Sequence, residues 1–506
     1  MSFKTQYISE PNLIFGGLKE EKDPRLGLSY YGPFQYEDEH DPLEKIKVGI
    51  IADGSMLSKI KEILNLIKKP IENSEKNKWL YPDFSGLSKG TVFKCSLETS
   101  KEWEQTITSG EIDNILKIEK ANERIGSAVQ MYIKKINNIL SEDNHPEVII
   151  CCIPKQIETY CGISEFTRGA KTPRKTDFEK QLDSFRKVNQ KFLSDWGVTA
   201  KIQEERLFGY DFRNSLKGKV MNLKNAVPIQ IIRESTADAM INYNPEGQKI
   251  RQEPASFAWN FATAIFYKAN GKPWRLAKLR QDTCYVGISF YQDKSNRDMQ
   301  TSMAQVFTHN GQGLVLRGTE VYLDERTKEP HLSEKQAEDL LKDSITRYTD
   351  RAGRNPTRVV IHKSTLFTDA EKRGFSKSIG ELKRDFVSLS QRKGIRFMRG
   401  GNYPVLRGTL VSLTDTQHLL FSSGYTPRIR TYPGHSIPQP LFITHIGDSE
   451  IKEICEEILG LTKLNWNTTS FSTFLPITLA FSNKVGRVLS EIDKDTVLQD
   501  HYRFYM

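Results

Sequence analysis

The chain has 506 residues, of which 38% are hydrophobic and 27% are charged, a composition typical of folded globular proteins and not of disordered ones. Lysine and arginine number 73 against 63 aspartates and glutamates, and the formal charge of +10 favours a polyanionic partner such as nucleic acid. The N-terminus has no apolar segment behind a basic start, and no apolar run reaches the roughly 18 residues of a membrane span. We therefore expect neither a secretory signal nor membrane insertion.

Cysteine usage points to a reducing compartment. The six cysteines show no CxxC spacing, which argues against a zinc ribbon and against a disulfide scaffold. We therefore predict a cytoplasmic protein. At about 150 residues per domain, the length predicts two to four domains.

The first half of the chain alternates strand and helix signals. Residues 1–45, rich in glycine, proline and acidic residues, predict an irregular arm. Apolar runs at 46–52 and 148–153 predict buried strands, and the apolar positions of 121–141 recur at helical spacing. Such alternation predicts an α/β layer with a mostly parallel, Rossmann-like sheet. The other predicted elements are a helix at 60–67, a basic loop at 168–175 and a helix at 178–195.

Near residue 280 the pattern changes, and strand signals begin to follow one another directly. The NGQG sequence at 310–313 separates two strand-like runs and predicts a hairpin. Ser333 with Gln336 predicts a capping box at the start of a helix. Three antiparallel strands, a helix, and then further strands and helices are the layout of an RNase H-like fold. The predicted strands are 283–291, 303–308, 314–321, 358–361, 404–422 and 440–445, with later helices at 449–460 and 475–492.

Cationic and amide side chains in two separated segments suggest a phosphate pocket. Arg213 and Lys217 are four residues apart and share one face of a predicted helix, and Gln230 begins the strand that follows. Lys268 ends a second, apolar helix. A terminal phosphate carries close to two charges and needs several donors, which such a group supplies. The alternative is an ordinary solvated helix face, and the spacing alone leaves both interpretations open.

Six separated motifs, in this order, resemble the MID and PIWI domains of Argonaute proteins, in particular the short prokaryotic Argonautes that lack N and PAZ domains. The resemblance implies an arm at 1–45, a Rossmann-like MID domain at 46–279 and an RNase H-like PIWI domain at 280–506. The motifs are EPNLIF…DPRLGLSYYGPF at 10–34, FRNSLK…VPIQIIREST at 212–236, YKANGKPWRL at 267–276, YVGISFY at 285–291, VVIHKS at 359–364 and LTKLNW…LPITLAFSNKVG at 461–486.

This resemblance assigns roles to the four pocket residues. It implies that Arg213, Lys217, Gln230 and Lys268 bind the 5′ phosphate of a short guide. Many members of the family have Tyr or His at the first position, so Arg213 departs from the common pattern; its guanidinium would grip the phosphate or stack on the first base. The resemblance also implies a guide RNA, a single-stranded DNA target, and a Mg²⁺ ion held in the pocket by the C-terminal carboxylate of Met506.

The nuclease site expected of an RNase H-like domain lacks its acidic residues. Such a site needs carboxylates that converge on two Mg²⁺ ions about 4 Å apart. The resemblance places two of these positions at Ser289 and Ser364, and no Asp or His stands at 481–483. Serine hydroxyls are poor Mg²⁺ ligands beside carboxylates. We therefore predict a catalytically inactive PIWI domain, so that the chain is not itself an enzyme.

Nearby acidic residues do not replace the missing ligands. Asp293 lies about 13 Å along the strand from Ser289 at 3.3 Å per residue, and the odd offset of Asp282 directs it to the other face. Glu320 is a single carboxylate and cannot hold two metal ions. An active nuclease that uses displaced carboxylates is nevertheless one alternative.

A guide-binding protein that does not cut needs another output. Short Argonautes of this kind resemble sensors in prokaryotic immunity against plasmids or phages. They pair with a separate protein that joins an analogue-of-PAZ domain to an effector, such as a TIR or sirtuin-like NADase or a nuclease. We predict that this chain is the sensor subunit of such a heterodimer. The other alternative is a small-molecule α/β enzyme, against which the IKVGIIADGS strand is not followed by a GxGxxG loop.

Overall fold

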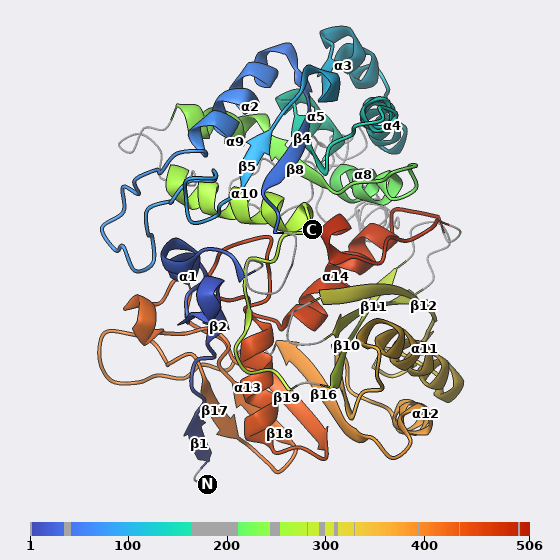
Figure 1. Ribbon diagram of the computed structural model, residues 1–506. Helices are drawn as coiled ribbons and strands as arrows, with labels where there is room; N and C mark the ends of the chain where they lie inside the picture. The colour runs from blue at the N-terminus through green and yellow to red at the C-terminus, as the bar shows by residue number, and fades with distance from the viewer. Residues whose placement is uncertain are drawn as a thin grey trace, which may run out of the picture.

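The structure is a computed structural model that describes residues 3–34, 42–162, 211–242, 253–280, 282–292, 299–307, 312–327, 329–391, 394–434, 436–493 and 496–506. Two α/β layers, one above the other in Figure 1, make up the molecule, and the C-terminus lies between them. The predicted loop at 168–175 and helix at 178–195 fall outside the described residues. None of the described helices combines the length and apolar character that crossing a bilayer requires.

The first layer is built on a parallel sheet with strand order β5-β4-β7-β8, and β6 lies beside β4. β4 (Lys45–Asp53) and β7 (Val148–Ile153) confirm the two predicted strands. β7 is apolar throughout because its alternate residues belong to different hydrophobic clusters on the two faces of the sheet. The remaining elements are β5 (Ser96–Glu98), β6 (Glu104–Ile107), β8 (Ile229–Arg233), α2 (Gly54–Leu66), α3 (Ser109–Leu116), α4 (Ala121–Leu140), α5 (Lys155–Cys161), α8 (Phe212–Val220), α9 (Glu234–Ile241) and α10 (Pro254–Lys268).

A nine-stranded sheet forms the second layer, in the order β1-β17-β18-β19-β16-β15-β10-β11-β12. β10, β15 and β16 run parallel at its centre, and antiparallel strands extend it on both sides. The predicted hairpin is confirmed by the antiparallel pairing of β11 with β12. The strands are β10 (Thr283–Gln292), β11 (Met299–Phe307), β12 (Gln312–Glu320), β15 (Arg358–Lys363), β16 (Lys383–Gln391), β17 (Thr409–Ser412), β18 (Gln417–Leu420) and β19 (Leu441–Gly447).

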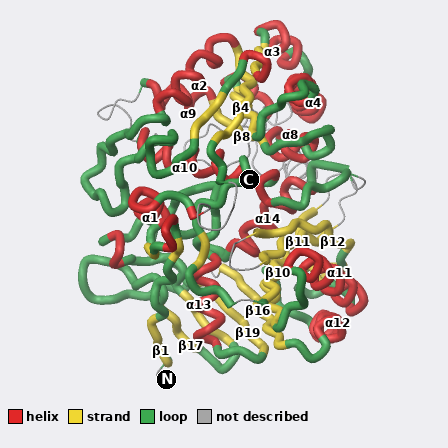
Figure 2. The backbone as a smooth tube through the Cα atoms, in the orientation of Figure 1, coloured by secondary structure: helices red, strands yellow, loops and turns green. Residues whose placement is uncertain are grey.

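Helices cover both faces of this second sheet (Figure 2). α11 (Glu334–Ala352) and α12 (Asp369–Ile379) share a hydrophobic cluster with one face. α13 (Ile451–Leu461) and α14 (Ile477–Leu489) pack on the other face. α11 begins at the predicted capping box, in which the Ser333 hydroxyl accepts from the Gln336 amide and the Gln336 side chain accepts from the Ser333 amide. The layer is therefore RNase H-like, as predicted.

The N-terminal segment is not the irregular arm that its composition predicts. β1 (Lys4–Tyr7) pairs with β17 and extends the second sheet, although its polar sequence gives no strand signal. α1 (Pro24–Tyr31) begins at Asp23, whose side chain caps the helix. Two short strands, β2 (Leu13–Ile14) and β3 (Glu20–Glu21), complete a small sheet with β9 (Arg275–Leu276). The prediction is wrong because partners far along the chain fix these elements.

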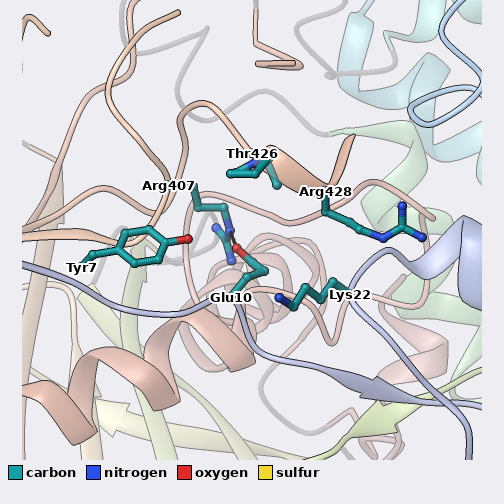
Figure 3. A pocket seen from close by; sticks show the side chains of 7 residues that line it. Tyr7, Glu10, Lys22, Arg407, Thr426 and Arg428 are labelled. Carbon is teal, nitrogen blue, oxygen red and sulfur yellow. Dashed lines mark hydrogen bonds and ion pairs between the residues drawn. The ribbon is translucent and has the colours of Figure 1, made fainter. Parts of the chain in front are cut away.

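A buried carboxylate fastens this segment to the second layer (Figure 3). Glu10 accepts a hydrogen bond from Nε of Arg407 at 2.8 Å, and its other oxygen lies 2.7 Å from Nζ of Lys463. The Lys463 ammonium also donates to the carbonyls of Pro11 and Lys22. These two cations hold the pKa of the Glu10 carboxyl below its usual value despite its burial. Glu10 therefore remains charged and ties the N-terminal segment to the second layer.

Candidate functional site

α8 brings the first two predicted pocket residues to the junction of the two layers. Asp211 caps the helix by accepting from the Asn214 amide at 2.9 Å, and Arg213 and Lys217 follow one turn apart. Lys217 is buried, and its ammonium donates to the carbonyl oxygen of Tyr505 at 3.3 Å. The helix thus faces the C-terminal tail of the chain.

Gln230 and Lys268 meet directly, although 38 residues separate them. Gln230 lies in β8, and Lys268 is the last residue of α10. The Lys268 ammonium donates to the Gln230 side-chain oxygen at 2.6 Å, and the lysine is only 2% exposed. A parallel strand and a helix of the first layer therefore deliver both groups to one point.

The electrostatics of Lys268 connect it to Arg213. Burial, together with the positive charges of Arg213 and Lys484, lowers the pKa of Lys268 to about 7. Arg213, Gln230 and Lys268 therefore lie close enough to interact, whereas Lys217 contacts the C-terminal tail. Lys484 is a residue that the sequence analysis missed. It lies on α14, within the last of the six motifs, but neither its spacing nor the resemblance assigned it to the pocket.

The C-terminal tail closes this junction. Met506 is 1% exposed, and the residues just before it belong to the hydrophobic core that both layers share. The tail contacts the end of α10, and Figure 1 places the C-terminus beside that helix and above α14. The chain end, with its terminal carboxylate, is therefore buried at this junction.

Ser289 lies on β10, and Ser364 directly follows the neighbouring strand β15 at the centre of the second sheet. The parallel register pairs Gly287 with His362 and Ile288 with Lys363, so one further step brings Ser289 level with Ser364. The Ser364 amide also donates to the carbonyl of Ile288 at 3.4 Å. The structure therefore brings together the two positions at which the resemblance would place carboxylates.

Acidic residues near this point are absent or already paired, as far as the structure describes them. The described part of the chain contains no group of three or more His, Cys, Asp or Glu residues that could hold a metal ion. Asp282 lies before the start of β10 and pairs with Arg354 at 2.5 Å. Asp293 and the side chain of Glu320 lie outside the described residues.

The side chains next to Ser364 have structural partners. His362 is buried, its Nδ1 lies 2.8 Å from the Thr478 hydroxyl, and burial lowers its pKa to about 3. Lys363 points to the opposite face of the sheet, where it forms a buried ion pair with Glu371 at 2.5 Å. Glu371 is therefore committed to a lysine and does not face Ser289.

Comparisons with known proteins identify the fold. No protein-family model and no curated protein matches the chain. The Argonaute of Clostridium butyricum, solved with a guide DNA and a 19-mer target DNA, matches with a TM-score of 0.61 and 16% identity over 98% of this chain and 54% of that one. Marinitoga piezophila Argonaute, solved with a 5′ OH guide RNA, matches with a TM-score of 0.54 and 13% identity over 99% of this chain and 59% of that one. A. aeolicus Argonaute matches with a TM-score of 0.53 and 14% identity over 97% of this chain and 54% of that one.

The chain thus spans between half and two thirds of the length of each of these proteins. At such low identity the likeness concerns the fold alone. Within that limit it agrees with the two layers described above, a parallel Rossmann-like sheet followed by an RNase H-like one. The protein has an Argonaute-like fold, with a MID layer followed by a PIWI layer.

Proposed function

We propose that this chain binds a 5′-phosphorylated short guide RNA at the junction of the two layers and pairs it with a complementary single-stranded DNA target. The observation that carries the proposal is Lys268. Its buried ammonium donates to a neutral amide while two further cations, Arg213 and Lys484, lower its pKa. Burial and these neighbouring charges disfavour the charged form of Lys268, and a phosphate dianion beside it would favour that form.

Binding of guides with different 5′ ends tests the pocket. We expect the unmodified chain to bind a 5′-phosphorylated guide at least tenfold more tightly than the same guide with a 5′ hydroxyl. Lys217→Met and Lys268→Met should each remove most of that difference. Lys224→Met is the matched control, because this exposed lysine loses the same charge outside the pocket.

Fluorescence anisotropy with labelled RNA and DNA guides measures these affinities. Marinitoga piezophila Argonaute was solved with a 5′ OH guide RNA, so both end chemistries belong in the experiment. Equal affinity for the two ends would refute the pocket. Sequencing the nucleic acid that co-purifies with the chain would report whether the natural guide is RNA or DNA, and its length.

We further propose that the chain does not cleave the target. The support is Ser289 on β10 and Ser364 just after β15, two adjacent positions at which carboxylates would have to converge on metal ions. Guided cleavage of a labelled target in Mg²⁺ or Mn²⁺ would overturn this and would favour an active nuclease with displaced carboxylates. The Lys268→Met variant distinguishes such activity from a contaminating nuclease. Cleavage that depends on the guide should be slower in this variant, whereas cleavage by a contaminant should be unchanged.

A Mg²⁺ ion in the phosphate pocket is part of the proposal, and the available donors fit it. Mg²⁺ is commonly bound by one or two carboxylates together with substrate phosphates and water. The terminal carboxylate of Met506 and the Gln230 oxygen are the protein groups that would hold it, together with the phosphate of the guide. Bound there, the ion would neutralise phosphate charge. Guide affinity should then fall on addition of a chelator, and a chelator-independent affinity would contradict this role.

The output of target recognition is proposed to come from a second protein. Because a chain that binds without cutting needs an effector, we propose a cytoplasmic heterodimer in prokaryotic defence against plasmids or phages. Its partner would carry an analogue-of-PAZ domain and a TIR, sirtuin-like or nuclease effector. Purification of the tagged chain from its host should recover one such protein in stoichiometric amount. A chain that is recovered alone as a stable monomer would contradict this assignment.

A further inference from the structure

One stretch of the second layer's sequence carries an excess of positive charge. Between residues 386 and 447 the sequence contains seven lysines and arginines and only one acidic residue, Asp415. More than half of the formal net charge of the whole chain is thus concentrated in 62 residues. None of these residues belongs to the guide pocket proposed above.

Two loops within this segment form one surface, which we call the arginine–aromatic surface (residues 394–404 and 424–431, with Trp79). The Tyr425 amide donates to the carbonyl of Val405 at 2.9 Å, and a bridge joins Leu406 to Tyr425. Asn77 donates to the carbonyl of Ile429, which brings the neighbouring Trp79 against the second loop. The surface therefore joins both layers of the molecule.

Aromatic rings in the first part of this surface are stacked and open to solvent. The rings of Tyr403 and Tyr425 lie 4.3 Å apart between centroids with an interplanar angle of 24°. The Arg399 guanidinium lies 5.8 Å from the centre of the Tyr425 ring. Tyr403 remains 43% exposed, and Arg399 is exposed. This arrangement presents an aromatic face beside a cation.

The second part repeats this combination around Trp79. The guanidinium groups of Arg428 and Arg430 lie 4.8 Å and 4.9 Å from the centre of the Trp79 ring. Arg428 is neutralised by Glu21 through two hydrogen bonds, at 2.7 Å and 2.6 Å, and Figure 3 shows it among the residues that line the pocket beside Glu10. Arg430 is exposed and holds the left-handed backbone conformation, with φ at +55°.

The exposed arginines of this surface have no acidic partner within the described part of the protein. Arg396, Arg399 and Arg430 form no ion pair there, whereas exposed arginines elsewhere, such as Arg347 and Arg373, pair with carboxylates. Tyr425 and Arg430 are five residues apart, so the two parts lie within about 17 Å of each other along the loop. Proteins that bind single-stranded nucleic acid combine cations, which bind the phosphates, with aromatic rings, on which the bases stack. This surface offers both.

We infer that the arginine–aromatic surface binds single-stranded nucleic acid, with arginines on the phosphates and Tyr403 stacking on a base. This contact is separate from the guide pocket and does not depend on a 5′ phosphate. Its chemistry also resembles a protein interface, in which tyrosine, tryptophan and arginine are common. The positive charge of the surface favours nucleic acid over a protein partner. A protein would have to carry a matching acidic patch, whereas every nucleic acid carries phosphates.

Binding of a 5′-hydroxyl 20-mer of deoxythymidine to the full chain tests this surface without the guide pocket. For Arg399→Gln with Arg430→Gln we expect affinity to fall about tenfold, and the slope of log affinity against log salt to shrink by about 1.4. Tyr403→Leu should weaken binding about fivefold or more through lost stacking. Arg347→Gln with Arg373→Gln removes the same charge on α11 and α12 and should leave affinity within twofold.

The outcomes separate this inference from the proposed function. The ratio of affinities for 5′-phosphate and 5′-hydroxyl strands should be unchanged in the Arg399 and Arg430 variant, whereas Lys268→Met should change only that ratio. Affinity within twofold of the unmodified chain in both the arginine and the Tyr403 variants would overturn the inference. So would an equal loss in the control variant, or variants that keep strand binding and lose only a bound protein.

Discussion

Guide binding should weaken as the pH rises above 7, because Lys268 must be charged to bind phosphate. In the free protein, burial together with Arg213 and Lys484 lowers the pKa of this lysine to about 7. A phosphate dianion next to the ammonium favours the charged form and raises its pKa in the complex. Binding therefore takes up a proton wherever Lys268 is neutral in the free protein, and affinity falls as pH rises through the pKa of the free site.

The size of the effect follows from that pKa. With a pKa of about 7, Lys268 of the free protein is protonated in about half of the molecules at pH 7, about one in eleven at pH 8 and about one in a hundred at pH 9. If the complex keeps the ammonium protonated throughout, the dissociation constant rises about fivefold from pH 7 to 8 and about tenfold from pH 8 to 9. Below pH 6 the phosphate itself gains a proton, so affinity should peak between about pH 6 and 7.

Anisotropy titrations of a 5′-phosphorylated guide at constant ionic strength from pH 5.5 to 9 measure this profile. Lys268→Arg should flatten it above pH 7, because a guanidinium stays charged throughout. Lys268→Met should bind weakly with a flat profile, and so should the unmodified chain with a 5′-hydroxyl guide. A wild-type dissociation constant that changes less than twofold between pH 7 and 9 would refute the reasoning.

Two further predictions concern stability. Glu10→Gln should lower the free energy of unfolding by about 3–5 kcal/mol, since it leaves the buried Arg407 and Lys463 without a charged partner; urea unfolding measures the loss, and a change below 1 kcal/mol would contradict the buried pairing. Gly287→Ala should destabilise by about 1–3 kcal/mol or more, since its Cβ would lie 2.4 Å from the backbone of Thr478. Thermal unfolding checks this, and an unchanged Tm would show that α14 does not pack there.

The regular elements could be predicted from the sequence because their signals are local. The strands at 46–52 and 148–153, the helix at 121–141, the hairpin and the capping box at Ser333 each follow from neighbouring residues, and the structure confirms them. β1 carries no such signal. Its four residues are mostly exposed and polar, and only pairing with β17 makes them a strand.

The candidate site also has a part that the sequence predicted and a part that it did not. Helical spacing placed Arg213 and Lys217 on one face, but spacing could not show that Lys268 would reach Gln230 from another helix. The cation on α14 was missed because nothing in the surrounding apolar sequence distinguishes Lys484 from a solvated lysine. Its proximity emerges only when the two layers meet and its charge acts on Lys268.

The buried lysines of the chain show why Lys268 indicates a ligand. Lys135, Lys363 and Lys463 are also buried, and each lies within 2.9 Å of a glutamate oxygen. Burying an ammonium without an opposite charge is costly, and these three sites avoid that cost within the fold. Lys268 is as deeply buried as Lys463, yet its acceptor is the neutral amide of Gln230. Among the described residues, no carboxylate forms an ion pair with Lys268, and we propose that the phosphate of a bound guide completes the pair.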